Sequence, residues 1–302
     1  MWGGPLARPV PDLPCATVVS MPGSRWILSI VLLVRAAAPA DPAPLRFAIL
    51  GDRTGSVQPG VYEQVWREVA AAKPEFVVTV GDLIEGSNDA SADQEWRAVE
   101  KILQPYRGIP LYLTPGNHDI WSPLSEKLWT RNAGHAPSYS FDRGPAHFTI
   151  LDNSRSDELS PEVLEFLEKD LKEHAAQPVK FILSHRPSWL FHVTLRNPGF
   201  ALHRLARQYG AHFVIAGHVH QMMRGELEGI TYISMPSSGG HLRSTAEYQT
   251  GWFFGYAMVE VLGADAAIEI HELKPPHGEG RVSKPADWTL FGQASKTQRA
   301  AM

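Results

Sequence analysis

The chain of 302 residues is long enough for one large domain or two small ones, and its 44% hydrophobic residues can bury a substantial core. The formal net charge is -4 and the sequence has no run rich in Lys and Arg, so no nucleic-acid-binding patch is evident. Cys15 is the single cysteine, which excludes a disulfide framework and a zinc site built from cysteines.

The N-terminal region carries a pattern typical of a secretory signal. Arg25 precedes an apolar stretch at 26–34, and Ala-Pro-Ala at 38–40 fits the small-x-small pattern of a cleavage site. The apolar stretch has about half the length that a membrane-spanning helix needs, so we expect no stable membrane span. We predict a signal near 21–40 within a disordered extension at 1–44, and hence a secreted or periplasmic protein. A cytoplasmic or N-terminally anchored protein is the alternative.

From residue 45 onward, short apolar strands alternate with amphipathic helices. We predict strands at 46–50, 75–80 and 110–114, with helices at 61–72 and 92–103 between them. Strands that alternate with helices in this way indicate βαβ units and a largely parallel sheet.

The second half of the chain has a different order of elements. We predict strands at 138–142, 147–152, 179–184, 211–217, 229–235, 254–261 and 267–273, and helices at 161–174 and 197–209. Ser160 is the expected N-cap of the first of these helices. This mixture indicates two sheets packed together with helices outside. We expect the domain to span 45–274 and the polar residues 275–302 to form a loosely ordered tail.

Polar side chains follow five of the predicted strands at the point where each strand ends. They are Asp52, Asp82, Asn117, His118, Asp119, His185, His218 and His220. In open α/β sheets, ligands collect beyond the carboxyl ends of the strands, so these side chains can converge on one point. Any one of them alone would be read as a turn, cap or packing residue, but their occurrence together in order favours a metal site. Oxygen and imidazole donors suit Mn, Fe or Zn.

The ordered motifs resemble those of the calcineurin-like metallophosphoesterases over roughly residues 46–272. They are Gly-Asp at 51–52 and 81–82, Gly-Asn-His-Asp at 116–119 and Gly-His-Val-His at 217–220. The resemblance implies an α/β fold, a four-layer α/β/β/α sandwich of two mixed β-sheets flanked by helices. It also implies a metal-dependent hydrolase of a small-molecule phosphate ester, either a phosphomonoesterase or a phosphodiesterase.

The resemblance further implies two metal ions that share one carboxylate. One ion would take Asp82, Asn117, His185 and His218 as ligands, and the other would take Asp82, Asp52 and His220. A hydroxide held between the two ions would attack the phosphorus. His118 would donate a proton to the leaving oxygen, and Asp119 would orient His118.

Position 54 departs from the family pattern, which has a metal-binding His there. Thr54 offers a neutral hydroxyl, a poor ligand for these metals. Glu85 lies three residues after Asp82, the offset at which purple acid phosphatases, which also lack this His, place a metal-binding Tyr. Glu85 is therefore a candidate ligand, directly or through water, and it would favour Mn or Fe over Zn. The alternatives are a water held by Thr54, a surface role for Glu85, or a weakened site on a non-catalytic protein-binding scaffold.

Three further residues are candidates for substrate binding. Arg53 and Arg186 each neighbour a predicted ligand, and a guanidinium can hold two phosphate oxygens at once. His241 lies in a Gly-flanked loop near a motif. For both arginines, a solvated or structural role is the alternative.

Overall fold

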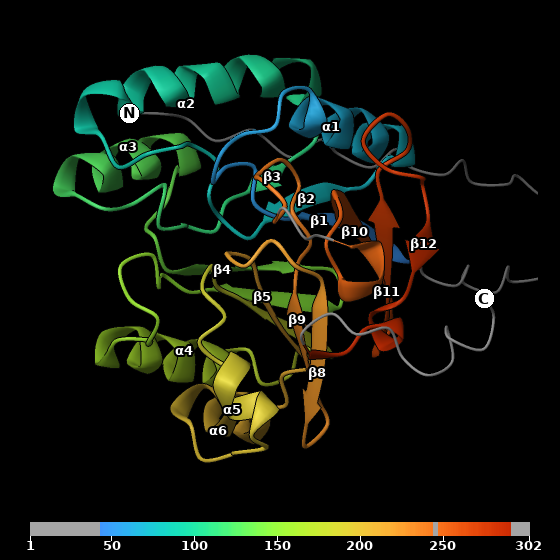
Figure 1. Ribbon diagram of the computed structural model, residues 1–302. Coiled ribbons are helices and arrows are strands. Elements are labelled where there is room, and N and C mark those ends of the chain that lie inside the picture. Colours follow the sequence, from blue (N-terminus) through green and yellow to red (C-terminus); the bar gives the residue numbers. More distant parts are fainter. Residues whose placement is uncertain (1–42, 244–246, 291–302) are drawn as a thin grey trace, which may run out of the picture. The chain divides into compact units, whose positions relative to one another are not determined.

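Two six-stranded β-sheets, each covered by helices on one side, organise residues 43–243 and 247–290, which the computed structural model describes (Figure 1). The predicted signal near 21–40, Cys15 and the end of the predicted tail at 291–302 lie outside the described residues, so the signal stays a prediction. Within the described residues, no helix is both long and apolar enough to cross a membrane.

The first sheet has the strand order β12-β11-β10-β1-β2-β3. Its strands are β1 (Leu45–Leu50), β2 (Phe76–Thr79), β3 (Leu111–Tyr112), β10 (Gly255–Leu262), β11 (Asp265–Glu272) and β12 (Val282–Ser283). The strands β1, β2 and β3 run parallel, as expected for strands joined by helices, whereas β10, β11 and β12 pair antiparallel with their neighbours.

The second sheet has the strand order β4-β5-β6-β7-β9-β8. Its strands are β4 (Tyr139–Arg143), β5 (Ala146–Ile150), β6 (Val179–Leu183), β7 (Phe213–Ala216), β8 (Met223–Leu227) and β9 (Ile230–Ser234). The four central strands β5, β6, β7 and β9 are parallel, and the edge strands β4 and β8 are antiparallel to their neighbours. Both sheets are therefore mixed, as predicted.

Helices cover the outer side of each sheet (Figure 1). The first sheet carries α1 (Val61–Ala72), α2 (Asp89–Leu103) and α3 (Pro123–Ala133), and the second carries α4 (Pro161–Glu173), α5 (Leu190–Thr194) and α6 (Ala201–Gln208). Ser160 caps α4 as predicted, because its hydroxyl accepts the main-chain N–H of Val163 at 3.3 Å. The predicted four-layer α/β/β/α order is confirmed.

The side chains of β1 show why its sequence is apolar throughout. Phe47 and Ile49 pack in the core between the two sheets, whereas Ala48 and Leu50 pack against the helices of the first layer. Phe47 meets Phe148 of the second sheet edge-on, with ring centroids 5.1 Å apart. Since both faces of the strand are buried, the sequence needs no alternation of polar residues.

The chain beyond residue 274 is more ordered than its composition indicated. The short strand β12 pairs with β11, and Trp288 is 2% exposed in the core between the sheets. The indole N–H of Trp288 donates to the Ser283 hydroxyl at 2.9 Å. The structure therefore departs from the expected tail at residues 282–288, because one buried Trp provides enough apolar area to fix a short polar segment.

Candidate metal centre

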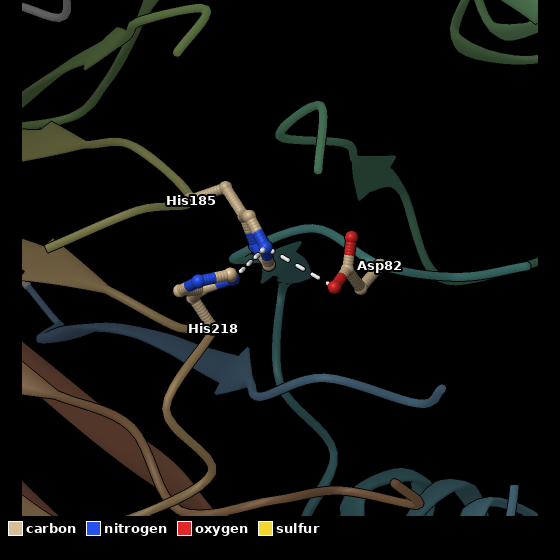
Figure 2. Close-up of side chains that lie close together, drawn as sticks. All are labelled: Asp82, His185 and His218. Carbon is tan, nitrogen blue, oxygen red and sulfur yellow. Dashed lines mark hydrogen bonds and ion pairs between the residues drawn. The ribbon is translucent and has the colours of Figure 1, made fainter. Parts of the chain in front are cut away.

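The loops that follow β1, β2, β3, β6 and β7 bring the motif residues together, and the tightest group surrounds His185. Its Nε2 atom lies 3.1 Å from Asp82 Oδ2, 3.0 Å from Asn117 Oδ1 and 3.2 Å from His218 Nδ1 (Figure 2 shows Asp82, His185 and His218). Donor atoms that share one ion through bonds of about 2.1 Å lie roughly 3.0–3.4 Å apart. The spacing therefore fits one metal ion held by these four side chains.

A second group of predicted ligands adjoins the first. Asp52 Oδ2 lies 3.3 Å from His220 Nε2, and both oxygens of Asp52 accept the main-chain N–H of His218, at 2.9 and 3.1 Å. Asp52 and Asp82 are 1% and 2% exposed, so both carboxylates are shielded from water. Asp52 and His220 thus stand where the resemblance places the ligands of the second ion, which shares Asp82 with the ion held by His185.

Main-chain carbonyl groups fix the tautomers of two of these histidines. His185 Nδ1 donates to the oxygen of Val80 at 2.8 Å, and His220 Nδ1 donates to the oxygen of His241 at 2.8 Å. A carbonyl oxygen only accepts, so Nδ1 carries a proton in both rings and Nε2, which faces a carboxylate, is the nitrogen that a metal ion would take. Metal-binding histidines in proteins are typically held in this way.

The two buried carboxylates make the centre attractive to cations. Burial alone would lower the pKa of His185, but the Asp82 and Asp52 carboxylates raise it to about 9. Burial lowers the pKa of His218 to about 4, and the positive charges of His185 and Arg186 act in the same direction. The negative environment that retains a proton on His185 Nε2 would equally stabilise a metal ion at that position.

Three of the candidate ligands have a backbone conformation that L-residues seldom adopt. The φ angles are 57° for Asp82, 70° for His218 and 58° for His220. Non-glycine residues in the left-handed region are uncommon and cost about 1–3 kcal/mol each, so they persist where the surrounding fold enforces them, often at functional sites. Their presence at three converging side chains supports a ligand-binding role.

Two motif glycines are required because the backbone lies directly against a carboxylate. A Cβ atom on Gly116 would lie 2.1 Å from Asp82 Oδ1, and one on Gly217 would lie 2.2 Å from Asp52 Oδ1. No side chain fits at either distance. The Gly-Asn-His-Asp and Gly-His-Val-His motifs therefore need glycine for the close packing of the loops as well as the polar residues for chemistry.

His118 is half-buried and lines a cavity of about 300 Å³ beside the centre. The lining also includes Asp82, His218, His220 and His241. His118 Nδ1 donates to the main-chain oxygen of Glu85, so a second proton on Nε2 would make the ring a cationic acid. The position suits the predicted proton donor.

Asp119 makes different contacts from the expected ones. Its buried carboxylate accepts the main-chain N–H groups of Asp82 and Leu83 at 2.8 Å each and that of Gly116 at 2.9 Å. The His118 ring is held by a carbonyl group of another loop instead. Asp119 therefore positions the loop that carries Asp82, and it has no direct contact among the described hydrogen bonds that would orient His118.

Glu85 holds the main chain of the loop that follows Thr54. The Glu85 carboxylate accepts the main-chain N–H of Val57 at 2.6 Å and that of Ser56 at 3.3 Å. Partial burial would raise the pKa of Glu85, but these N–H groups lower it below its usual range. Thr54 itself is fully buried. The ionised Glu85 carboxylate thus holds the loop at 54–57 in place. Ligation of a metal ion by Glu85 stays a prediction.

The two candidate arginines are engaged away from the cavity. Arg53 Nη1 donates to the main-chain oxygen of Leu83 at 2.6 Å, and Arg186 Nη1 pairs with Asp157 Oδ1 at 2.7 Å. Neither arginine is among the residues that line the cavity, whereas His241 is. The contacts of Arg53 and Arg186 therefore fit a structural role better than a substrate-binding role.

Two supporting residues lie outside the motifs that the sequence revealed. Asn153 is 3% exposed, and its Oδ1 accepts the main-chain N–H groups of His185 and Arg186 at 3.0 Å each. The Ser238 hydroxyl accepts the N–H of Gly51 at 2.9 Å. Asn153 follows β5, so the rule that polar residues gather at strand ends would have found it, but Ser238 carries no comparable signal.

A second His-Asp group lies on β4, β5 and α4, at the amino end of β5. His147 is fully buried, and its nitrogens pair with Asp142 at 2.7 Å and with Asp170 at 2.9 Å. Burial would lower the pKa of His147, but these carboxylates raise it above the ordinary value. Because both ring nitrogens are already engaged by carboxylates within the core, we assign this group to the fold.

Comparisons with known proteins agree with this geometry. A family model described as calcineurin-like phosphoesterase matches residues 45–222. The chain is 27% identical over 189 residues to 3',5'-cyclic adenosine monophosphate phosphodiesterase CpdA of Escherichia coli K12, and the match covers 59% of this chain and 66% of that protein, slightly less than two thirds. It is 28% identical over 186 residues to a 3',5'-cyclic-nucleotide phosphodiesterase of Nostoc, covering 58% of this chain and 67% of that protein.

A solved structure shares the fold. The purple acid phosphatase PPD1 from yellow lupin superposes with a TM-score of 0.59 at 18% identity, covering 85% of this chain and 54% of that chain. The family match extends over more than half of the chain and includes the loops that carry Asp52, Asp82, Asn117, His185 and His218. The chain therefore belongs to the calcineurin-like phosphoesterase family.

Proposed function

We propose that the protein is a metal-dependent phosphodiesterase and that cyclic nucleotides are its substrate class. The observation that carries the proposal is the group of donor atoms 3.0–3.2 Å from His185 Nε2, beside a cavity that His118 also lines. The sequence left monoester and diester open. The E. coli and Nostoc relatives are named as cyclic-nucleotide phosphodiesterases, which favours the diester.

The residues of the centre fit two divalent or trivalent ions. Asp82, Asn117, His185 and His218 would hold one ion, and Asp52, Asp82 and His220 would hold the other. The donor set consists of oxygens and imidazoles, which suit Mn, Fe or Zn, and Mn or Fe is favoured if Glu85 contributes. When bound, such ions polarise phosphoryl oxygens and lower the pKa of an attached water.

His118 is the residue proposed to move a proton. Its ring is fixed through Nδ1 by the carbonyl group of Glu85, and it lines the cavity next to Asp82. A proton on Nε2 can then pass to the oxygen of the departing alcohol, which lowers the barrier most when that alcohol is a poor leaving group.

The proposal is tested with metal-stripped protein that is reloaded with Mn and assayed on 3',5'-cyclic AMP, bis(4-nitrophenyl) phosphate and 4-nitrophenyl phosphate. We expect turnover of both diesters to exceed that of the monoester. A preference for the monoester would refute the substrate class. Absence of turnover with any divalent metal, in a sample shown to be folded by circular dichroism, would support the non-catalytic scaffold instead.

Replacing Glu85 with alanine is expected to weaken binding of the metal ion held by Asp52, Asp82 and His220 about tenfold, because the carboxylate orders the loop that contains Thr54. Thr54→Ala should be milder, and Thr54→His should raise the affinity for Zn relative to Mn. Titration of each variant with Mn and Zn, followed by elemental analysis, measures these changes. Glu165→Ala, an exposed residue of α4, is the control. A larger loss in Thr54→Ala than in Glu85→Ala would show that Thr54 anchors a water ligand.

A further inference from the structure

Two residues outside every motif line the cavity beside the candidate metal centre. Arg243 lies in the loop after β9, and Trp252 precedes β10. The guanidinium carbon of Arg243 lies 4.9 Å from the centroid of the Trp252 ring, a cation–π contact. The two side chains therefore form one wall of the cavity that also contains Asp82, His118 and His218.

The Arg243 guanidinium differs from the other arginines near the centre. Arg53 and Arg186 donate to a carbonyl group and a carboxylate. Across residues 43–243 and 247–290, no hydrogen bond or carboxylate partner engages Arg243, and its side chain is exposed. One face of the guanidinium meets Trp252, so its N–H donors and its other face remain for a ligand that enters the cavity.

The wall formed by Arg243 and Trp252 suits a ligand that carries a flat, aromatic group. Nucleobases stack on Trp rings and on guanidinium planes, whereas an aliphatic alcohol such as glycerol presents no π face. The cavity volume of about 300 Å³ lies at the small end of ligand sites, which suits a mononucleotide better than an oligonucleotide. We propose that Arg243 and Trp252 form a stacking subsite for the base of a cyclic mononucleotide whose phosphate lies at the candidate metal centre. This inference rests on the proposed function.

The test compares two diesters in Mn-loaded protein. Trp252→Leu and Arg243→Lys are each expected to raise KM for 3',5'-cyclic AMP about tenfold, with kcat changed less than about twofold, because a base stack contributes to binding. Hydrolysis of glycerophosphoethanolamine should be unchanged, which also shows that the variants are folded. Arg243→Lys retains the positive charge but removes the flat guanidinium group on which a base could stack. Phe191→Leu and Arg97→Lys change an exposed aromatic residue and an exposed arginine elsewhere, and both should behave as the unaltered protein.

Three results would overturn the subsite. They are an equal rise in KM for both diesters, unchanged kinetics in Trp252→Leu, and full activity of Arg243→Lys, which would assign Arg243 a purely electrostatic role.

A binding measurement separates failure of the stacking subsite from failure of the proposed function. If the unaltered protein hydrolyses neither diester, equilibrium dialysis with 5'-AMP and with inorganic phosphate decides the inference. A loss of 5'-AMP binding of about tenfold in both variants, with phosphate binding unchanged, supports the subsite. Equal binding of 5'-AMP by the variants and the unaltered protein, or no binding by any of them, refutes it.

Discussion

Replacing Asp82 with asparagine is expected to lower the phosphodiesterase rate at least about 100-fold and to reduce the content of both metal ions. Asp82 is the one carboxylate that both proposed ligand sets share. Its Oδ2 lies 3.1 Å from His185 Nε2, and its Oδ1 accepts the main-chain N–H of His118 at 2.8 Å. Asparagine has the same shape and can keep the second contact, but it lacks the negative charge that two cations need.

Rate measurements with saturating Mn and elemental analysis after dialysis test this expectation. Asp93→Asn is the matched control, because Asp93 lies on α2 and pairs with Arg97 and Arg131 at the surface. We expect this control to retain the rate and the metal content of the unaltered protein. An Asp82→Asn protein that keeps two ions and at least half of its rate would show that Asp82 is not the shared ligand.

The fold could be predicted from the sequence where local pattern and tertiary burial agree. The predicted helix at 61–72 matches α1, since Val61, Val65 and Val69 form one buried stripe. The strand β8 was missed because its sequence, Met-Arg-Gly-Glu-Leu, has no apolar run and obtains its structure by pairing with β9. The helix α3 was missed although Ser122 and Pro123 form a standard helix start.

The candidate site was predictable to the extent that each residue follows a strand. His185 and His218 were located by that rule, and the structure brings their ring nitrogens within 3.2 Å. Adjacency in sequence was a poorer guide for Asp119, whose neighbour His118 turns toward the cavity while Asp119 turns toward buried backbone amides.

Contacts between separate loops could not be predicted from any motif. Arg243 and Trp252 meet only because the loop after β9 and the segment before β10 pack beside the same cavity. Asn153 supports His185 from a distance of 32 residues along the chain, through a contact that depends on β5 and β6 being neighbours. Such contacts are set by tertiary packing, so a single sequence carries no periodic signal for them.

Replacing His118 with asparagine is expected to reduce the rate on substrates with poor leaving groups by roughly 10²–10⁴-fold, while metal content stays unchanged. His118 lines the cavity, and its ring is anchored by a main-chain carbonyl group, but it makes none of the side-chain contacts that gather around His185. Asparagine can keep a hydrogen bond to that carbonyl group but cannot supply an acidic proton. A phosphodiester with a 4-nitrophenol leaving group needs little protonation, so its hydrolysis should fall much less.

The diagnostic quantity is therefore the dependence of the rate on the pKa of the leaving alcohol, measured for a series of aryl and alkyl phosphodiesters. His271→Asn on β11, where His271 stacks on Tyr256, is the control and should leave that dependence unchanged. If His118→Asn slowed all diesters by the same factor, His118 would bind the substrate without donating a proton. If it also lost metal, His118 would belong to the metal centre. Only a steeper dependence on leaving-group pKa, at constant metal content, identifies His118 as the general acid.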